Sequence, residues 1–144
     1  MSMNKRKHLM IKKNERRTSL RVKPEKETEI RVDLNGENFI DIFYATDISI
    51  GGIALRVPHL FEGCKINLPV DCLVRLPIPI DNSFHAQGKI IHISGERFGV
   101  AFQNLNENYE NMIKDYVNYR LKEISWIAWI SHKLGITSLS SRLI

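Results

Sequence analysis

The 144-residue sequence predicts a small, mainly β protein: a six-stranded antiparallel β-barrel followed by a C-terminal α-helix. Three observations lead to this fold class. Short stretches of alternating apolar residues recur between about residue 28 and residue 102, as in half-buried strands. Glycine, proline and asparagine separate these stretches and mark turns. Beyond Asn104 the apolar period lengthens from that of a strand to that of a helix.

The strands follow from their alternation and from the turns between them. The stretches, given by residue number, are 28–34, 39–46, 53–57, 72–76, 84–93 and 97–102. Asn35-Gly36 predicts a two-residue hairpin between the first two strands. Pro77 and Pro79 follow the fourth strand and indicate a strand end or an edge. Six short strands at this spacing suit a small barrel.

The segment after Asn104 has the pattern of an amphipathic helix. Its apolar residues on one helical face are Tyr109, Met112, Ile113, Tyr116 and Val117. Asn106 is a suitable N-cap, and the helix is expected to run to about Lys133 and stop at Gly135. Farther along, Trp126 and Trp129 either pack back onto the barrel rim or form a surface for self-association or for a partner. Contact with a membrane surface is a weaker third interpretation.

Charge is distributed unevenly along the chain. Residues 1–23 hold nine lysines and arginines and one acid, a net +8, whereas the remainder holds twelve basic and fifteen acidic residues, a net −3, which together make the net +5 of the whole chain. The basic character therefore belongs to the N-terminal arm. Such an arm is expected to meet an anion: nucleic acid, an acidic membrane surface or a phosphate-bearing ligand.

Length and composition exclude several classes of protein. A chain of 144 residues suits one domain with a modest core. Cys64 and Cys72 form no CxxC pair and have no histidine spaced for a zinc site, so we expect free thiols in a reducing compartment. The N-terminus lacks a secretory apolar run, and the most apolar stretch, residues 124–131, is shorter than the ~20 residues of a bilayer span. We therefore expect a cytoplasmic protein.

The first motif that carries chemistry is RRTSLR, ahead of the first strand. It places Arg17 and Arg21 four residues apart, with Arg16 beside them. Guanidinium groups bind phosphates through paired hydrogen bonds, donate to the O6 and N7 of guanine and stack on purines. Alone, the motif is also compatible with a solvated basic tail.

The second motif, DISIGG, contains Asp47, Ser49, Gly51 and Gly52. Asp47 can accept from the N–H donors of guanine, and Ser49 adds an adaptable hydroxyl. We expect the glycines to turn the backbone with positive φ and to let a flat base approach closely. A tight β-turn with an Asx-type hydrogen bond would explain the same residues. Together the two motifs suit an anionic guanine nucleotide between a basic arm and a barrel face.

RRTSLR followed by DISIGG resembles the paired signature RxxxR and [DN]xSxxG of PilZ domains, which are small bacterial β-barrels that bind cyclic di-GMP. GKIIHIS…RFGVAFQNL and the helix after it resemble the closing strands and C-terminal helix of that family. The resemblance covers roughly residues 14–120. RxxxR alone is a weak signal in an arginine-rich chain, but both motifs in order, flanking the first strands of a barrel pattern, are specific.

The resemblance implies roles for individual residues. The positions that match ligand-binding positions of the family are Arg16, Arg17, Arg21, Asp47, Ser49, Gly51 and Gly52. Arg17 and Arg21 would grip phosphates and guanine edges, with Arg16 assisting, while Asp47 and Ser49 would read a guanine. A weaker position departs from some members: a histidine, His92, stands where an aromatic such as Trp can pack on the ligand. A histidine can also stack, although a lone one is more often structural or exposed.

The resemblance implies a non-catalytic cyclic di-GMP receptor that is a stand-alone module. Residues 1–13 would be a flexible basic tail, 14–120 the PilZ domain and 121–144 a helical extension. We expect no enzyme activity, catalytic cofactor or metal site, because no nucleophile elbow, metal-ligand helix or Walker loop is present. The expected partners are cyclic di-GMP, an unidentified downstream protein and a second copy bound through Trp126 and Trp129.

Two alternatives stay open. A nucleic-acid-binding barrel would use the same basic arm and bind DNA or RNA with strong salt dependence. Its acidic body and the absence of a row of surface aromatics count against it. An adaptor could also keep the fold without a ligand, although the intact motifs count against that interpretation.

Overall fold

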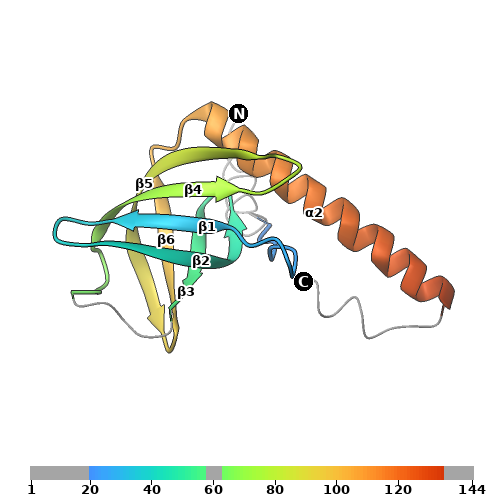
Figure 1. The fold of residues 1–144 in the computed structure, drawn as a ribbon, viewed down its shortest axis with the longest axis horizontal. Helices are drawn as coiled ribbons and strands as arrows, with labels where there is room; N and C mark the ends of the chain where they lie inside the picture. The colour runs from blue at the N-terminus through green and yellow to red at the C-terminus, as the bar shows by residue number, and fades with distance from the viewer. Residues whose placement is uncertain (1–19, 58–62, 135–144) are drawn as a thin grey trace, which may run out of the picture.

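The computed structural model describes residues 20–57 and 63–134. Six strands close into an antiparallel barrel in the order β1-β2-β3-β6-β5-β4, and a long helix follows (Figure 1), so the predicted fold class is confirmed. The elements are β1 Arg31–Asn35, β2 Ile40–Ser49, β3 Gly52–Arg56, β4 Pro69–Leu76, β5 Asn82–Ser94, β6 Arg97–Gln103 and α2 Glu107–Leu134.

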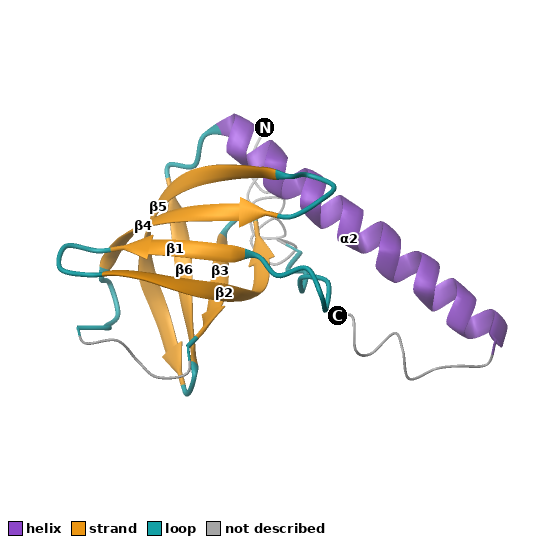
Figure 2. Cartoon of the chain, viewed as in Figure 1, coloured by secondary structure: helices purple, strands orange, loops and turns teal. Residues whose placement is uncertain are grey.

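The core fills the inside of the barrel, because alternate residues of each strand point inward. The wholly or almost wholly buried side chains include Val32, Leu34, Ile48, Leu55, Val74, Phe84, Ile90, Phe98 and Val100. The rings of Phe43 and Phe98 meet edge to face across the core, with centroids 5.3 Å apart. The sheet therefore has one apolar surface and one solvent-facing surface, and a site can lie on the outer one. Figure 2 shows the strands curving around the interior, with α2 outside the barrel.

The predicted two-residue turn at Asn35-Gly36 is wrong. Asn35 pairs with Ile40, so residues 36–39 make a four-residue connection, and neither Asn35 nor Gly36 has a positive φ. The amide of Gly36 donates to the carbonyl of Phe39 over 2.9 Å. A Cβ at Gly36 would collide with the ring of Phe39, which packs against the core. The glycine thus makes room for an aromatic ring.

The predicted end of β4 and the predicted start of α2 agree with the structure. β4 ends at Leu76, directly before Pro77, and since it pairs with both β1 and β5 it is not an edge strand. The helix begins after Asn106, whose side-chain oxygen accepts from the amide of Asn108 over 2.8 Å, as expected of an N-cap. The expected stop at Gly135 lies outside the described residues.

Helix α2 joins the core mainly through its first half and Leu121. Ile113 and Tyr116 are fully buried, and the ring of Tyr109 lies against Phe84 with centroids 5.7 Å apart. The second half projects beyond the barrel (Figure 1). Trp126 and Trp129 are 64% and 59% exposed, so the interpretation that they pack on the barrel rim is wrong. Among the described residues, no helix is long and apolar enough to cross a membrane.

We predict that Gly52→Ala destabilises the barrel by about 1–3 kcal/mol, the usual cost of overpacking. A Cβ at Gly52 would collide with the carbonyl oxygen of Val100 and lie 3.3 Å from the Cα of Ala101, so β3 and β6 would have to move apart. Urea denaturation measures the change. Gly51→Ala is the matched control, because its Cβ would have only Ser49 Oγ nearby, at 3.8 Å. Equal stability of the two variants would contradict the explanation.

Candidate functional site

The chain just before the first strand is attached to the end of β2. The amide of Val22 donates to the carbonyl of Ile48, and the amide of Ile48 donates to the carbonyl of Val22, both over 3.0 Å. Both side chains are buried in the core. Because neighbours in extended chain point to opposite sides, Arg21 faces outward, and its side chain is 65% exposed. This pair of hydrogen bonds holds Arg21 beside the DISIGG motif.

A β-bulge in β2 decides which way the motif faces. Ala45 pairs with Leu55 but Asp47 pairs with Ala54, so Thr46 is an extra residue. A bulge shifts the inward and outward alternation by one position. Ile48 consequently enters the core, and Asp47 and Ser49 lie on the opposite side of the strand. If Thr46 took part in regular alternation instead of forming a bulge, the carboxylate of Asp47 would point into the apolar interior.

The outer surface of β3 and β6 next to this motif is unusually flat. Gly52 pairs with Ala101 and Ala54 pairs with Gly99, so four small residues form one patch. This small-residue floor belongs to a cleft of ≈ 800 Å³ that is also lined by Arg21 and by residues described below. A surface with so little side chain lets a planar group lie against the backbone.

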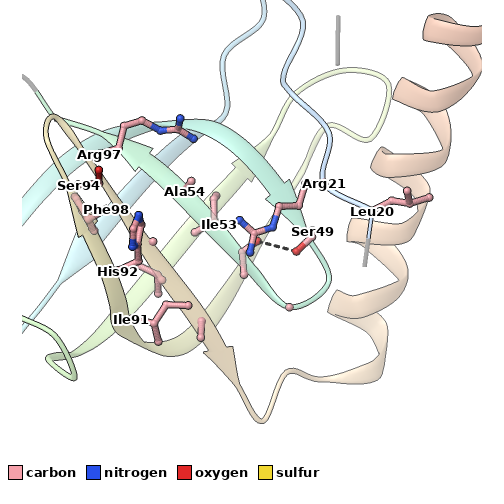
Figure 3. Close-up of a pocket in the computed structure, with 15 residues that line it drawn as sticks. Leu20, Arg21, Ser49, Ile53, Ala54, Ile91, His92, Ser94, Arg97 and Phe98 are labelled. Carbon is pink, nitrogen blue, oxygen red and sulfur yellow. Dashed lines mark hydrogen bonds between the residues drawn. The ribbon is translucent and has the colours of Figure 1, made fainter. Parts of the chain in front are cut away.

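A second bulge forms the far side of the cleft. Ile90 pairs with Val100 but His92 pairs with Gly99, so Ile91 is the extra residue of β5. Ile91 and His92 are therefore both exposed, next to the small-residue floor. Arg97, the first residue of β6, stands beside them. Figure 3 shows Arg21 and Arg97 reaching over the same barrel face from opposite sides, with His92 near Arg97.

Asp47 lies between these two arginines. Its Oδ2 accepts from Arg97 Nη2 over 3.1 Å, and its Oδ1 lies 3.9 Å from Arg21 Nη1. The carboxylate side chain is 16% exposed, whereas the arginine side chains are 65% and 56% exposed. Asp47 is thus linked to the cleft by its ion pairs with Arg21 and Arg97, and both guanidinium groups keep donors free for an anion.

Ser49 lies at the turn between β2 and β3 and lines the cleft. Its hydroxyl donates to the carbonyl of Gly52 over 3.5 Å, which is long for such a bond. The turn itself is tied to β6, because the carbonyl of Gly51 accepts from the amide of Phe102 over 2.9 Å. The expectation that Gly51 and Gly52 need positive φ is wrong. Gly52 is required instead by the close approach of β6.

The structure brings together only part of the predicted site. Arg21, Ser49, Gly51 and Gly52 line one cleft, and Asp47 is joined to it through its ion pairs with Arg21 and Arg97. Arg16 and Arg17 lie outside the described residues. Sequence reasoning missed Arg97 as a partner of Asp47, and it also missed the small-residue floor. Both depend on the pairing of β3 with β6. The only local signal was the alternation of glycine and alanine in the two strands.

The charges and lining residues distinguish this cleft from another one on the barrel. The other cleft, of ≈ 590 Å³, is lined by Asp33, Asp71, His85 and polar amides and by no lysine or arginine. An anion is therefore attracted to the first cleft rather than to the second. Within residues 20–57 and 63–134 no cluster of histidine, cysteine or carboxylate side chains could hold a metal ion. The first cleft offers guanidinium groups that can donate to a phosphate and a floor of small residues. The carboxylate of Asp47, paired with both arginines, is the acceptor beside it.

Comparisons with known proteins agree with this fold. The model of the PilZ domain family matches residues 15–119. No curated protein matches the chain. Among solved structures, the PilZ domain with c-di-GMP of YcgR from Escherichia coli is 18% identical, with a TM-score of 0.63, and the match covers 78% of this chain and 97% of that one.

Two further structures come from longer proteins. The Bacillus subtilis inhibitor of motility, MotI/DgrA, is 16% identical with a TM-score of 0.64, and the match covers 75% of this chain and 52% of that one. The Borreliella burgdorferi PlzA protein in complex with c-di-GMP is 17% identical with a TM-score of 0.51, covering 77% and 45%. The chain thus spans about half the length of these two proteins, and likeness at such identities shows the shared barrel.

We predict that Asp47→Ala and Arg97→Ala each change the free energy of unfolding by less than about 1 kcal/mol, because ion pairs with well-exposed arginines contribute little. Urea denaturation measures this. Phe98→Ala is the positive control: its side chain is fully buried, and the loss should be about 3–5 kcal/mol. A loss at Asp47 close to that of Phe98→Ala would mean that the carboxylate holds the barrel together.

Proposed function

The chain belongs to the PilZ domain family, and from that premise we propose that it is a non-catalytic receptor for cyclic di-GMP. The observation that carries the proposal is the first cleft. Arg21 and Ser49 line it beside a floor of small residues, and Asp47 pairs with Arg21 next to it. Those groups complement a ligand with two phosphates and two flat guanine bases.

The proposed binding mode assigns each group a task. Arg21 grips a phosphate and a guanine edge together with Arg17, and Arg16 assists by charge or stacking. Asp47 accepts from the N1–H and N2–H₂ groups of one guanine, and Ser49 adds a hydroxyl. The base lies on the small-residue floor, where the outward Cβ atoms are few or absent. We propose Gly51 and Gly52 as the backbone platform for this contact.

Arg97 and His92 complete the proposed cleft. Arg97 Nη2 donates to Oδ2 of Asp47 over 3.1 Å. A guanine edge would take over that acceptor and release the guanidinium to face a phosphate or stack on a base. His92 is exposed beside the floor, so its ring is available for stacking.

The comparisons support the same ligand. The YcgR PilZ domain and the PlzA protein were both solved with c-di-GMP. Their barrels superpose on this chain at low identity, and this chain carries the two ligand motifs of the family in order. We therefore take cyclic di-GMP as the ligand, with no catalytic cofactor and no enzyme activity.

Signal output would pass through the arm and the long helix. We propose that the ligand draws residues 14–23 over the barrel and so changes the surface offered to a downstream protein. The ordering costs conformational entropy, which charge-assisted hydrogen bonds must offset. We propose that residues 1–13 are a basic tail, residues 14–120 the PilZ domain and residues 121–144 a helical extension. We also retain a cytoplasmic location, because Cys64 and Cys72 are both free thiols, as a reducing compartment favours.

The exposed tryptophans of α2 are the proposed contact surface for a second copy of the chain. Both lie on the part of the helix that projects beyond the barrel. We predict that the chain self-associates and that Trp126→Glu combined with Trp129→Glu makes it monomeric, since buried tryptophan contributes much of an interface. Sedimentation velocity measures this. A monomeric wild-type chain would leave the surface to a different partner.

We predict saturable binding of cyclic di-GMP, with a Kd in the micromolar range or tighter, in a calorimetric titration of the full chain. Arg17→Ala, Arg21→Ala and Asp47→Ala should each weaken binding at least tenfold, about 1.4 kcal/mol. The matched control is Arg75→Ala, which removes an exposed arginine that pairs with Asp33 instead.

Titrations with GTP and with a short single-stranded RNA separate the alternatives. No heat with cyclic di-GMP but salt-sensitive binding of RNA would favour the nucleic-acid-binding barrel. No binding of any of the three would favour the ligand-free adaptor. Wild-type affinity in one of the three variants would remove that residue from the site.

A further inference from the structure

One arginine of α2 is buried although arginine is rarely found inside a protein. Arg120 is 2% exposed and lies in the part of the helix next to the barrel. Taking a guanidinium out of water costs free energy unless its donors are satisfied. A well-packed apolar side chain at such a position is often as stable or more stable. The burial of Arg120 therefore indicates a role beyond filling space in the core, and its contacts show which one.

Arg120 connects α2 to the chain that carries Arg21. Its Nε donates to the backbone carbonyl of Lys23 over 2.8 Å, and its Nη1 donates to Glu123 Oε2 over 2.6 Å. The other oxygen of Glu123 accepts from the hydroxyl of Tyr119 over 2.7 Å. The carboxylate thus fixes the orientation of the guanidinium, as a paired charge does in a low-dielectric site.

The same helix face has a second contact with this segment. The hydroxyl of Tyr119 also lies beside the carboxylate of Glu25, and hydrogen bonding to Glu123 and Glu25 raises the pKa of Tyr119. Glu25 belongs to a short turn in which the amide of Thr28 donates to its carbonyl over 3.1 Å. Residues 23 and 25 are therefore both linked to α2, just before the chain enters β1.

The residues that make these contacts follow one another directly in the sequence. Arg21 faces the cleft, Val22 is hydrogen-bonded to Ile48 on β2, and Lys23 is held by Arg120. Ile48 in turn lies between Asp47 and Ser49 of the motif. Residues 21–23 are thus fixed by β2 on one side and by α2 on the other. Releasing the Lys23–Arg120 contact removes the link to α2 nearest to Arg21 and leaves the Val22–Ile48 pair and the contact at Glu25.

We infer that Arg120 is a positioning residue for the ligand: it holds the base of the arm, residues 21–23, so that Arg21 stands over the cleft, and it links the cleft to α2. The inference rests on the proposed function, because it assigns a route of regulation to that site. Linkage is reciprocal, so a ligand that fixes Arg21 also stabilises the Lys23–Arg120 contact. Occupancy of the cleft is thereby communicated to the helix that carries both tryptophans.

The test compares Arg120→Met with Val117→Ala. Methionine keeps an unbranched apolar side chain, although a shorter one, and has no donors for Lys23. Val117 is 7% exposed on the same helix and has no side-chain hydrogen-bonding group, so its truncation loosens the helix without removing the Lys23–Arg120 hydrogen bond. Calorimetry with cyclic di-GMP and hydrogen–deuterium exchange of peptides covering residues 20–28 are measured for both full-length variants.

Arg120→Met is expected to bind cyclic di-GMP at least tenfold more weakly than the wild type and to exchange faster at residues 20–28 without ligand. Val117→Ala should bind cyclic di-GMP within about twofold of the wild-type affinity and keep the wild-type exchange rate at residues 20–28. This should hold even if its melting temperature falls as far as that of Arg120→Met. Wild-type affinity and wild-type exchange in Arg120→Met would overturn the inference. An equal weakening of binding in both variants would also overturn it, because helix stability alone would then be the cause.

Arg120→Lys covers the case in which Arg120→Met does not fold. Lysine keeps the charge but cannot donate to Lys23 and Glu123 in the fixed geometry of a guanidinium, so exchange at residues 20–28 should still be faster than in Val117→Ala. Exchange equal to that control would overturn the inference. If the wild type does not bind cyclic di-GMP, the proposed function fails, and the exchange of the ligand-free proteins still decides whether Arg120 positions the arm.

Discussion

Every side chain of a closed barrel must point either into the core or toward solvent, and the cleft depends on how two strands meet this constraint. Strict alternation would send Asp47 into the apolar interior. The extra residue Thr46 shifts the register, so that Ile48 is buried and Asp47 turns outward. The extra residue Ile91 has the same effect beside the cleft and exposes His92. Bulges often re-aim side chains next to functional sites, and here two of them face each other across β3 and β6.

The electrostatics of the cleft follow from the same arrangement. Asp47 is brought between Arg21 and Arg97, which belong to segments far apart in the sequence. The carboxylate offsets part of the arginine charge while both guanidinium groups stay exposed. The ion pairs with Asp47 therefore hold the two arginines in place while their guanidinium groups keep donors free. A site that exchanges internal ion pairs for contacts with a ligand requires this. Arg120 adds a second constraint on the arm from the helix side.

The sequence was sufficient for elements whose signal is local. Strand alternation, the Asn106 cap and the DISIGG motif each lie within a few residues, and the fold class followed from them. The turn after β1 was misread because the packing of Phe39 overrides the local Asn-Gly preference. The role of Gly52 was misread for a similar reason, since it depends on β6. Arg97 was missed because its partner is fifty residues away in the chain.

The most direct test of the central claim is an ¹H–¹⁵N NMR titration of the full chain with cyclic di-GMP. The account predicts saturable shifts at Asp47–Gly52 and at Gly99 and Ala101, with little change at Gln87 and Gln103 of the other cleft. Saturable shifts at the other cleft, or none at the floor of β3 and β6, would contradict the assignment of this barrel face as the ligand site.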